Sequence, residues 1–200
     1  MSAPATELPA DFRAIMKIKA VFLDRDGVLN PHIPGGYLLS AADFILLPGV
    51  APAIRRLNDT RLKVIVISNQ QGVGKGLMTL DDLAAIGRRM DELLLAEAGA
   101  FVDRCYYCIE LAEANSPHRK PKPGMLLEAA QDFKLTLAHT VFAGDSQTDI
   151  QAGHAAGVGK TALLLSGGIR AYADGDFSPA PDLVFSSLPD LAGWVLEQSQ

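Results

Sequence analysis

The sequence has few of the features that would place it in an oxidising or membrane environment. It contains two cysteines in 200 residues, which is too few for a disulfide framework and fits a reducing cytoplasm. It has no apolar run near the roughly 20 residues that cross a bilayer. Its start, MSAPATELPADFRAIMKIKA, lacks the apolar segment of a secretory signal. We therefore expect a cytoplasmic protein without a membrane partner.

An excess of positive charge is also missing. The 18 Lys and Arg residues are outnumbered by 23 Asp and Glu residues, which gives a net charge of −5. Such a chain is a poor partner for a polyanionic backbone, and it has no aromatic and basic groove for single strands. We expect no nucleic-acid partner, although a local basic pocket is compatible with this balance.

Nothing divides the chain into repeats, low-complexity tracts or linked domains, and its length suits one domain with a substantial core. We expect residues 1–17 to form an N-terminal tail and residues 18–200 to form a single domain. Residues 27–48 are rich in glycine and proline. They are expected to form a flap region over the functional site.

Short β-branched runs alternate with longer segments of helical spacing. The predicted strands are 19–24, 63–68, 103–109, 140–145, 160–165 and 182–187. The predicted helices are 49–59, 80–98, 123–134, 147–156 and 189–197. In 80–98 the apolar stripe is expected to consist of Leu80, Leu83, Ala84, Met90, Leu93 and Leu94. This alternation predicts an α/β, three-layer, Rossmann-like fold with a mainly parallel sheet, in which ligands bind beyond the carboxyl ends of the strands.

Asp24 and Asp26 end the first predicted strand, in the stretch VFLDRDGVLN. Residues two apart in an extended chain point to the same side, so both carboxylates would face one pocket while Arg25 faces away. At about 6 Å and an effective dielectric near 20, two carboxylates repel by roughly 3 kcal/mol. A metal-binding pair, with one acid free to attack, is one interpretation. A turn with helix-capping aspartates is the other.

Two further segments suit phosphate. Ser68 and Asn69 end the second strand, where a hydroxyl and backbone N–H groups match phosphate oxygens, although Ser-Asn also makes ordinary turns. Arg119, Lys120 and Lys122 precede a predicted helix. Basic side chains oppose the helix dipole at that end, and a bound anion would reverse the sign. A solvated basic loop is the alternative.

Asp145 and Asp149 follow the fourth strand, in GDSQTD. Asp145 would meet Asp24 and Asp26 at the edge of the sheet, and three converging acids favour Mg²⁺. Asp149 lies four residues further on and shares a helix face with Asp145. Stabilisation of the helix start by its negative charge is the alternative role of Asp149.

Together the segments read D-x-D-G, S-N, K and G-D-x-x-x-D, each at a strand end or a helix start. This set resembles that of the haloacid dehalogenase-like (HAD) phosphohydrolases over roughly residues 18–165. The finer pattern is similar to the histidinol-phosphatase and D-glycero-D-manno-heptose-1,7-bisphosphate 7-phosphatase group; it consists of FLDRDGVLN, SNQQGVGKG, RKPKPGMLLEAA and GDSQTDIQAGHAAGV. The resemblance implies a HAD fold with a lid made of loops and no large cap domain.

The resemblance also implies roles for the acids. Asp24 would be the nucleophile that forms an aspartyl-phosphate. Asp26 would protonate the leaving oxygen and then activate water. Mg²⁺ would be bound by Asp24, Asp145 and Asp26, the last through its backbone carbonyl.

By the same resemblance, Ser68 and Lys120 would hold the phosphoryl oxygens and Asn69 would join them in binding substrate. Arg119 would recognise the remote part of the substrate. Lys120 matches the Arg-Lys-Pro pattern of the group, and Lys122 is the alternative.

The loop CIELAEANSPHRKP departs from the zinc loop of the group, which reads Cys-x-His and later Cys-x-Cys. Cys108 keeps the first position, but Glu110, Ser116 and His118 replace the other three. A tetrahedral zinc site needs four good ligands, so zinc is not expected. A second departure is Ser146, where the group commonly has lysine, and it leaves the substrate open.

Cys105 and Cys108 form a Cys-x-x-Cys pattern within the predicted strand 103–109. Their odd separation would point the two thiols to opposite faces of the sheet. This favours two buried small side chains over a redox or zinc pair.

The sequence thus predicts a Mg²⁺-dependent phosphomonoesterase acting on a small phosphorylated metabolite. A heptose bisphosphate is the first candidate, histidinol phosphate the second, and the acidic net charge disfavours a nucleic-acid 3′-phosphatase. A non-catalytic phosphosugar-binding module is the rival of another class; loss of Asp24 or Asp26 would favour it, and both are present. His32, in the flap region, is a further candidate contact for substrate.

Overall fold

The computed structural model describes residues 18–169 and 171–199. Within these residues, six parallel strands form one sheet in the order β3-β2-β1-β4-β5-β6. The strands are β1 (Ala20–Leu23), β2 (Lys63–Asn69), β3 (Arg104–Cys108), β4 (Thr140–Gly144), β5 (Lys160–Leu164) and β6 (Leu183–Phe185). The predicted tail, residues 1–17, lies outside the described residues.

The α-helices of the described part are α1 (Val50–Asp59), α2 (Leu80–Ala98), α3 (Gly124–Asp132), α4 (Gln147–Ala156) and α5 (Leu188–Gln198). Short 3₁₀ helices are η2 (Ala41–Asp43), η3 (Ala112–Ala114) and η4 (Leu137–His139). The bounds predicted for α2 and α4 are confirmed. Those of the other α-helices and the strands differ from the prediction by one or two residues at one or both ends.

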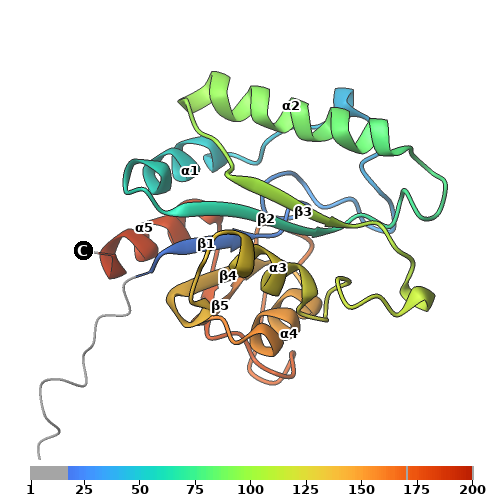
Figure 1. Ribbon diagram of the computed structural model, residues 1–200. Coiled ribbons are helices and arrows are strands. Elements are labelled where there is room, and N and C mark those ends of the chain that lie inside the picture. The colour runs from blue at the N-terminus through green and yellow to red at the C-terminus, as the bar shows by residue number, and fades with distance from the viewer. Residues whose placement is uncertain (1–17, 170, 200) are drawn as a thin grey trace, which may run out of the picture.

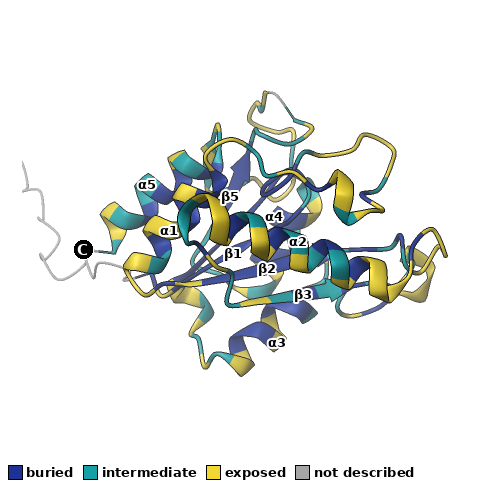
Figure 2. Ribbon diagram, turned by 90° about the horizontal axis from the view of Figure 1, so that it is seen from above, coloured by how far each residue is buried: buried dark blue, intermediate teal, exposed yellow. Residues whose placement is uncertain are grey.

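Helices cover both faces of the sheet. Figure 1 shows α1, α2 and α5 on one side and α3 and α4 on the other. Val21 and Leu23 of β1 pack into the core beneath the first group, and Phe22 packs into the core beneath the second. In Figure 2 the central strands β1 and β2 are largely buried, and the outward faces of the helices are exposed. Because each such side chain contributes about 1.5–3 kcal/mol when fully buried, the two cores hold the three layers together. The predicted three-layer α/β fold is confirmed.

Helix α2 is set by local signals at both ends. The Thr79 hydroxyl accepts the Asp82 N–H at 3.1 Å, and the Asp82 carboxylate accepts the Thr79 N–H at 2.8 Å. This reciprocal pair satisfies two N–H groups that the helix itself leaves free. Gly99 ends the helix with a φ of 62°, in the left-handed region that favours glycine.

The apolar stripe predicted on α2 is partly wrong. The buried residues are Leu83, Ile86, Met90 and Leu94, whereas Leu80 and Ala84 are exposed. Leu80 lies six residues before Ile86, which is less than two full turns of 3.6 residues each. Its side chain is therefore rotated away from the face that Ile86 buries.

The two cysteines lie on opposite faces of β3, as their spacing predicts. Cys105 packs against the core beneath α1, α2 and α5, and Cys108 is buried in the core beneath α3 and α4. Both are free thiols. Burial raises the pKa of the Cys105 thiol to about 11, which disfavours the nucleophilic thiolate.

The flap region, residues 27–48, connects β1 to α1 and is anchored in the core. Leu29, Leu38 and Phe44 are buried, and the middle of the segment lines the pocket described below. Within residues 18–169 and 171–199 this connection holds only η2, which agrees with the predicted lack of a large cap domain. In the same residues, no helix combines the length and the apolar character that a bilayer crossing requires.

Candidate functional site

The predicted site residues gather where the carboxyl ends of the central strands meet. Asp24 follows β1, Ser68 and Asn69 end β2, and Asp145 follows β4. The chain passes from β1 to neighbours on both sides, so this is the point at which strand order reverses and α/β sheets bind ligands. A pocket of about 200 Å³ lies here. Its lining residues are Asp24, Asp26, His32, Ile33, Gly36, Tyr37, Leu38, Ser68, Asn69, Gln70, Lys120, Asp145, Ser146 and Thr148.

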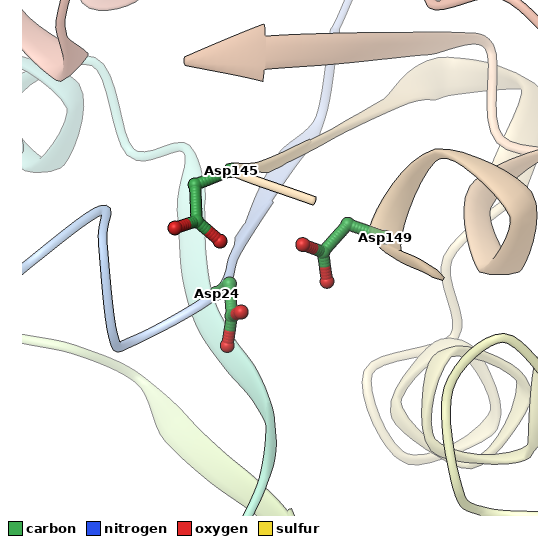
Figure 3. A group of neighbouring side chains, drawn as sticks. All are labelled: Asp24, Asp145 and Asp149. Atoms are coloured by element: carbon green, nitrogen blue, oxygen red, sulfur yellow. The ribbon is translucent and has the colours of Figure 1, made fainter. Parts of the chain in front are cut away.

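Three carboxylates converge at the base of the pocket. Asp24, Asp145 and Asp149 each place an oxygen within 4.8 Å of the other two, and Figure 3 shows the three side chains gathered together. Burial raises the pKa of Asp24 to about 6, with Lys120 opposing and Asp149 and Asp26 adding to the rise. Burial, followed by repulsion from Asp24 and Asp149, raises the pKa of Asp145 to about 7. A divalent cation would relieve this repulsion, and the all-oxygen donor set fits Mg²⁺.

Two glycines make room for the Asp145 carboxylate. A Cβ at Gly27 would lie 2.0 Å from Asp145 Oδ2, and a Cβ at Gly167 would lie 2.2 Å from the same atom. Gly27 also has a φ of 84°, in the left-handed region that side chains disfavour. The close approach of both backbones therefore requires glycine.

Lys120 is the cation at the base of the site. Its Nζ lies 3.0 Å from Asp24 Oδ1 and 2.6 Å from Asp149 Oδ1, and it donates to the Ile67 carbonyl at 3.0 Å. Burial disfavours the ammonium, but Asp149 and Asp24 more than offset this and raise the pKa of Lys120. Lys122 instead donates to the Asn115 carbonyl on an exposed loop. This geometry favours Lys120 over Lys122 as the residue that contacts a phosphate at Asp24.

Asp149 has the contacts of the alternative considered for it, stabilisation of the helix start, and a second contact that the sequence did not predict. One oxygen, Oδ2, accepts the Ser146 N–H at 3.1 Å and the Ser146 hydroxyl at 2.6 Å at the start of α4. The other oxygen pairs with Lys120. Asp149 is fully buried. It therefore stabilises the helix start and also fixes the lysine beside Asp24.

Asp26 shares the pocket but stands apart from the carboxylate cluster. Its Oδ1 accepts from Asn30 Nδ2 at 2.8 Å, and its Oδ2 accepts from Gln70 Nε2 at 2.8 Å and Arg25 Nη2 at 2.9 Å. Burial opposes the charge, but Arg25, Asn30 and Gln70 together lower the pKa of Asp26. The predicted metal contact of Asp26 through its backbone carbonyl stays a prediction.

Arg25 does not simply face away from the site. Its side chain is fully buried and its guanidinium returns to pair with Asp26. The alternation of a strand sets the direction of Cβ, and the long arginine side chain can still reach back to its neighbour. Arg25 is not among the predicted site residues, because strand alternation alone places its side chain on the other face of the sheet.

Ser68 and Asn69 both line the pocket, with different contacts. Ser68 is buried, and its hydroxyl, which accepts from Gln70 Nε2 at 3.1 Å, counteracts the rise in the pKa of Asp24. The Asn69 side chain donates to the Lys120 carbonyl and accepts the Lys120 N–H, each at 3.1 Å. Asn69 thereby fixes the backbone that carries the lysine.

A cationic rim, formed by Tyr37, Gln71, Lys75 and Arg119, lies beside the pocket through Tyr37. The Tyr37 hydroxyl accepts from Gln71 Nε2 at 2.7 Å and from Lys75 Nζ at 2.8 Å. Arg119 Nη2 donates to Gln71 Oε1 at 3.1 Å. The hydrogen bond from Lys75, the largest effect, lowers the pKa of Tyr37. Of these residues, only Arg119 is predicted from the sequence. The other three come together only when the flap region folds against the segment after β2, and no local motif marks them.

His32 lies in the pocket, whereas the cysteine and histidine of the loop before Arg119 do not line it. The Nδ1 of His32 lies 3.4 Å from Asp145 Oδ2. In the loop, His118 Nε2 lies 3.2 Å from Glu128 Oε2 and Cys108 Sγ lies 4.0 Å from Glu110 Oε2. Among the residues that the structure describes, the Asp24, Asp145 and Asp149 cluster is the only group of three potential metal ligands of the His, Cys, Asp and Glu types.

Comparison with known proteins places this arrangement in a family. Residues 117–191 match the family described as HAD-hydrolase-like. The D-glycero-D-manno-heptose-1,7-bisphosphate 7-phosphatase of Thermosynechococcus vestitus is 37% identical over 88% of this chain and 94% of its own length. The D-glycero-beta-D-manno-heptose-1,7-bisphosphate 7-phosphatase of Haemophilus ducreyi is 35% identical over 88% of this chain and 98% of its own.

A solved structure shows the same relationship in three dimensions. The D,D-heptose 1,7-bisphosphate phosphatase of B. bronchiseptica, crystallised with magnesium and phosphate, superposes with a TM-score of 0.84 at 33% identity. The match covers 90% of this chain and 99% of the other. The predicted family, fold and enzyme class are confirmed. The chain is a phosphatase of the HAD-like hydrolases and belongs to the family of the heptose-1,7-bisphosphate 7-phosphatases.

Proposed function

We propose that the chain removes the 7-phosphate from a D-glycero-D-manno-heptose 1,7-bisphosphate, with Mg²⁺ as its cofactor and in the cytoplasm. The observation that carries the proposal is the meeting of Asp24, Asp145 and Lys120 in one buried pocket. It joins a carboxylate nucleophile, an acidic cation site and a lysine for phosphoryl oxygens. The named activities of the two relatives supply the substrate.

In the proposed reaction, Asp24 and Asp26 divide the chemistry. An Asp24 oxygen attacks phosphorus, the bond from phosphorus to the leaving oxygen breaks, and Asp26 gives that oxygen a proton. Water then attacks the aspartyl-phosphate while Asp26 accepts its proton, which releases phosphate and restores Asp24. The lowered pKa of Asp26 suits the hydrolysis of the aspartyl-phosphate, in which Asp26 acts as a base. For the transfer step Asp26 must be protonated, so it takes up a proton when substrate binds.

The residues around Asp24 bind and orient the phosphoryl group. Lys120 contacts Asp24 and the Ser68 hydroxyl lies in the same pocket, and both would turn to the phosphoryl oxygens when substrate enters. The carboxylates of Asp24 and Asp145 and the Asp26 backbone carbonyl would hold Mg²⁺, which when bound neutralises charge on the transferred group. Asn69 fixes the peptide of Lys120.

The rim supports a substrate with a second anion. Arg119 and Lys75 bring two cations to the mouth of the pocket, and a remote phosphate would pair with them. Histidinol phosphate carries an ammonium at its remote end, which the same cations would repel. The rim therefore favours a bisphosphate.

We also propose that the enzyme works without zinc. Cys108 and His118 are the two ordinary zinc ligands left in the loop, and His118 pairs instead with Glu128. A tetrahedral structural site needs four ligands. Metal analysis of the purified protein that finds near-stoichiometric zinc would contradict this.

The first test is a substrate screen of the purified protein. Heptose 1,7-bisphosphate, heptose monophosphates, histidinol phosphate and nucleotides are compared by kcat/KM with Mg²⁺ and with EDTA. We expect the bisphosphate to rank first and EDTA to abolish turnover. Asp24→Asn should lower kcat by about 10³-fold or more with the fold intact, whereas Asp59→Asn, an exposed aspartate on α1, should not. Histidinol phosphate ranking first would reassign the substrate, and no metal-dependent turnover would sink the function.

A further inference from the structure

Gln70 lies at the centre of a buried polar network that the reaction above does not use. It is 3% exposed. Its Nε2 lies 2.8 Å from Asp26 Oδ2 and 3.1 Å from Ser68 Oγ, and its Oε1 lies 2.9 Å from Arg25 Nη2. One amide thus joins the acid–base residue to a phosphate-binding residue.

The orientation of this amide follows from its partners. A guanidinium can only donate hydrogen bonds, so the atom facing Arg25 must be the amide oxygen. The amide nitrogen then faces Asp26 and Ser68 and supplies both with a donor. The buried Arg25 therefore fixes which way Gln70 points.

For Ser68, this arrangement decides where the hydroxyl hydrogen goes. Its oxygen accepts from Gln70, so its own hydrogen is free to be donated elsewhere. The same hydroxyl counteracts the rise in the pKa of Asp24, so it lies close enough to the nucleophile to donate to an arriving phosphoryl oxygen. Gln70 thereby keeps the Ser68 hydroxyl a donor toward the reacting group.

Gln70 also connects Asp26 to another part of the fold, the end of β2. Arg25 and Asn30 belong to the same turn as Asp26 and would move with it. Among the described residues, Gln70 is the hydrogen-bond partner of this carboxylate from outside that turn. It ties Asp26 to the end of β2, which is paired with β1 in the sheet.

We propose that Gln70 is a positioning residue, which holds the Asp26 carboxyl group where it protonates the leaving oxygen and holds the Ser68 hydroxyl toward the phosphoryl group. This inference rests on the proposed function, in which Asp26 is the general acid. Without Gln70, Asp26 would turn with its own loop, and leaving-group protonation would weaken.

The test compares two substrates of nearly the same shape, phenyl phosphate and 4-nitrophenyl phosphate, with Mg²⁺. Phenolate is the more basic leaving group and needs protonation more, so a misplaced acid slows phenyl phosphate selectively. For Gln70→Leu we expect kcat/KM to fall about 10-fold more for phenyl phosphate than for 4-nitrophenyl phosphate. This is a part of the rate acceleration of about 10²- to 10⁴-fold that general acid catalysis typically contributes. The inhibition constant of inorganic phosphate should rise as well.

Controls separate this role from a structural one. A structural defect lowers the active fraction equally for both substrates and leaves their ratio unchanged. Gln70→Glu, which keeps the size and the contact to Arg25 but replaces the donor nitrogen, should shift the ratio in the same direction and serves if Gln70→Leu does not fold. Gln131→Glu, on the exposed face of α3, should leave the ratio and the inhibition constant unchanged.

The outcomes separate this inference from the proposed function. An unmodified protein that hydrolyses both esters, with Gln70 variants that keep its ratio, overturns the inference and leaves the function standing. A shifted ratio with an unchanged phosphate inhibition constant overturns the part about Ser68. An unmodified protein that hydrolyses neither ester overturns both.

Discussion

The Asp145 carboxylate lies in a crowded position, and this crowding is the clearest feature at the scale of single residues. Gly27 and Gly167 approach its carboxylate so closely that neither could carry a Cβ without displacing it. The carboxylate also lies near two other acids. The position of the Asp145 carboxylate thus depends on two backbones from distant parts of the chain.

Gly27→Ala should damage activity more than stability. The new Cβ would push Asp145 out of the cluster, and we expect kcat/KM to fall at least about 10-fold, as for misplacements of about 1 Å near the chemistry. The left-handed φ should add a cost of about 1–2 kcal/mol in unfolding free energy. Gly157→Ala is the matched control, because Gly157 has a φ of 76° and nothing within 4 Å of its Cβ position. Equal activity losses in both variants would contradict the role of space at Gly27.

At this scale, the sequence predicts the acids and the lysine but not their supports. Asp24 and Asp145 follow strand ends, where ligands bind in such sheets, and the resemblance to the HAD phosphatases singles out Lys120 through the Arg-Lys-Pro pattern. Gln70 and Arg25 act through partners that only the folded chain supplies, such as Asp26 and Ser68. A glutamine has no preferred role outside its contacts, so the sequence alone does not predict a function for Gln70.

At the scale of elements, local signals set most boundaries. The capping pair of Thr79 and Asp82 and the left-handed Gly99 fix both ends of α2, and the sequence predicts these ends correctly. The face that α2 buries is less predictable, because Leu80 fits the apolar pattern but lies outside the contact with the sheet. Hydrophobic spacing alone does not say where a stripe begins.

Thr79→Ala should lower the free energy of unfolding without changing catalysis. Loss of the hydroxyl leaves the Asp82 N–H without its partner at the helix start, a change that costs typically about 1 kcal/mol. Urea denaturation measures this, and kcat/KM should stay unchanged because Thr79 does not line the pocket. An unchanged denaturation midpoint would show that Asp82 alone caps α2.

At the scale of the whole molecule, the alternation of strands and helices predicts the layers, and strand order is seen only in the structure. The order places β1 between β2 and β4, so that Asp24, Ser68 and Asp145 arrive at one edge. The path of the flap region was not predictable in detail, because its anchors, Leu29, Leu38 and Phe44, are irregularly spaced.

The metal-free protein should lose stability as the pH rises from about 5 to about 8. Asp24 and Asp145 have pKa values of about 6 and about 7 in the fold, against a usual value of 3.8, so the folded state binds more protons in this range. The free energy of unfolding should fall by about 4 kcal/mol across the window if both groups titrate. Thermal unfolding with EDTA measures the fall, and Mg²⁺ should reduce it by stabilising the carboxylates. Stability that rises with pH in EDTA would contradict the cluster.

The pairing of β1 with β4 has a consequence for synthesis of the chain. Ala20 pairs with Thr140, so Asp24 emerges from the ribosome long before the strand that brings Asp145 beside it. A nascent chain that ends before β4 carries the nucleophile but lacks both Asp145 and Asp149. Phosphatase activity therefore begins late in translation, and its onset would report when the centre of the sheet closes.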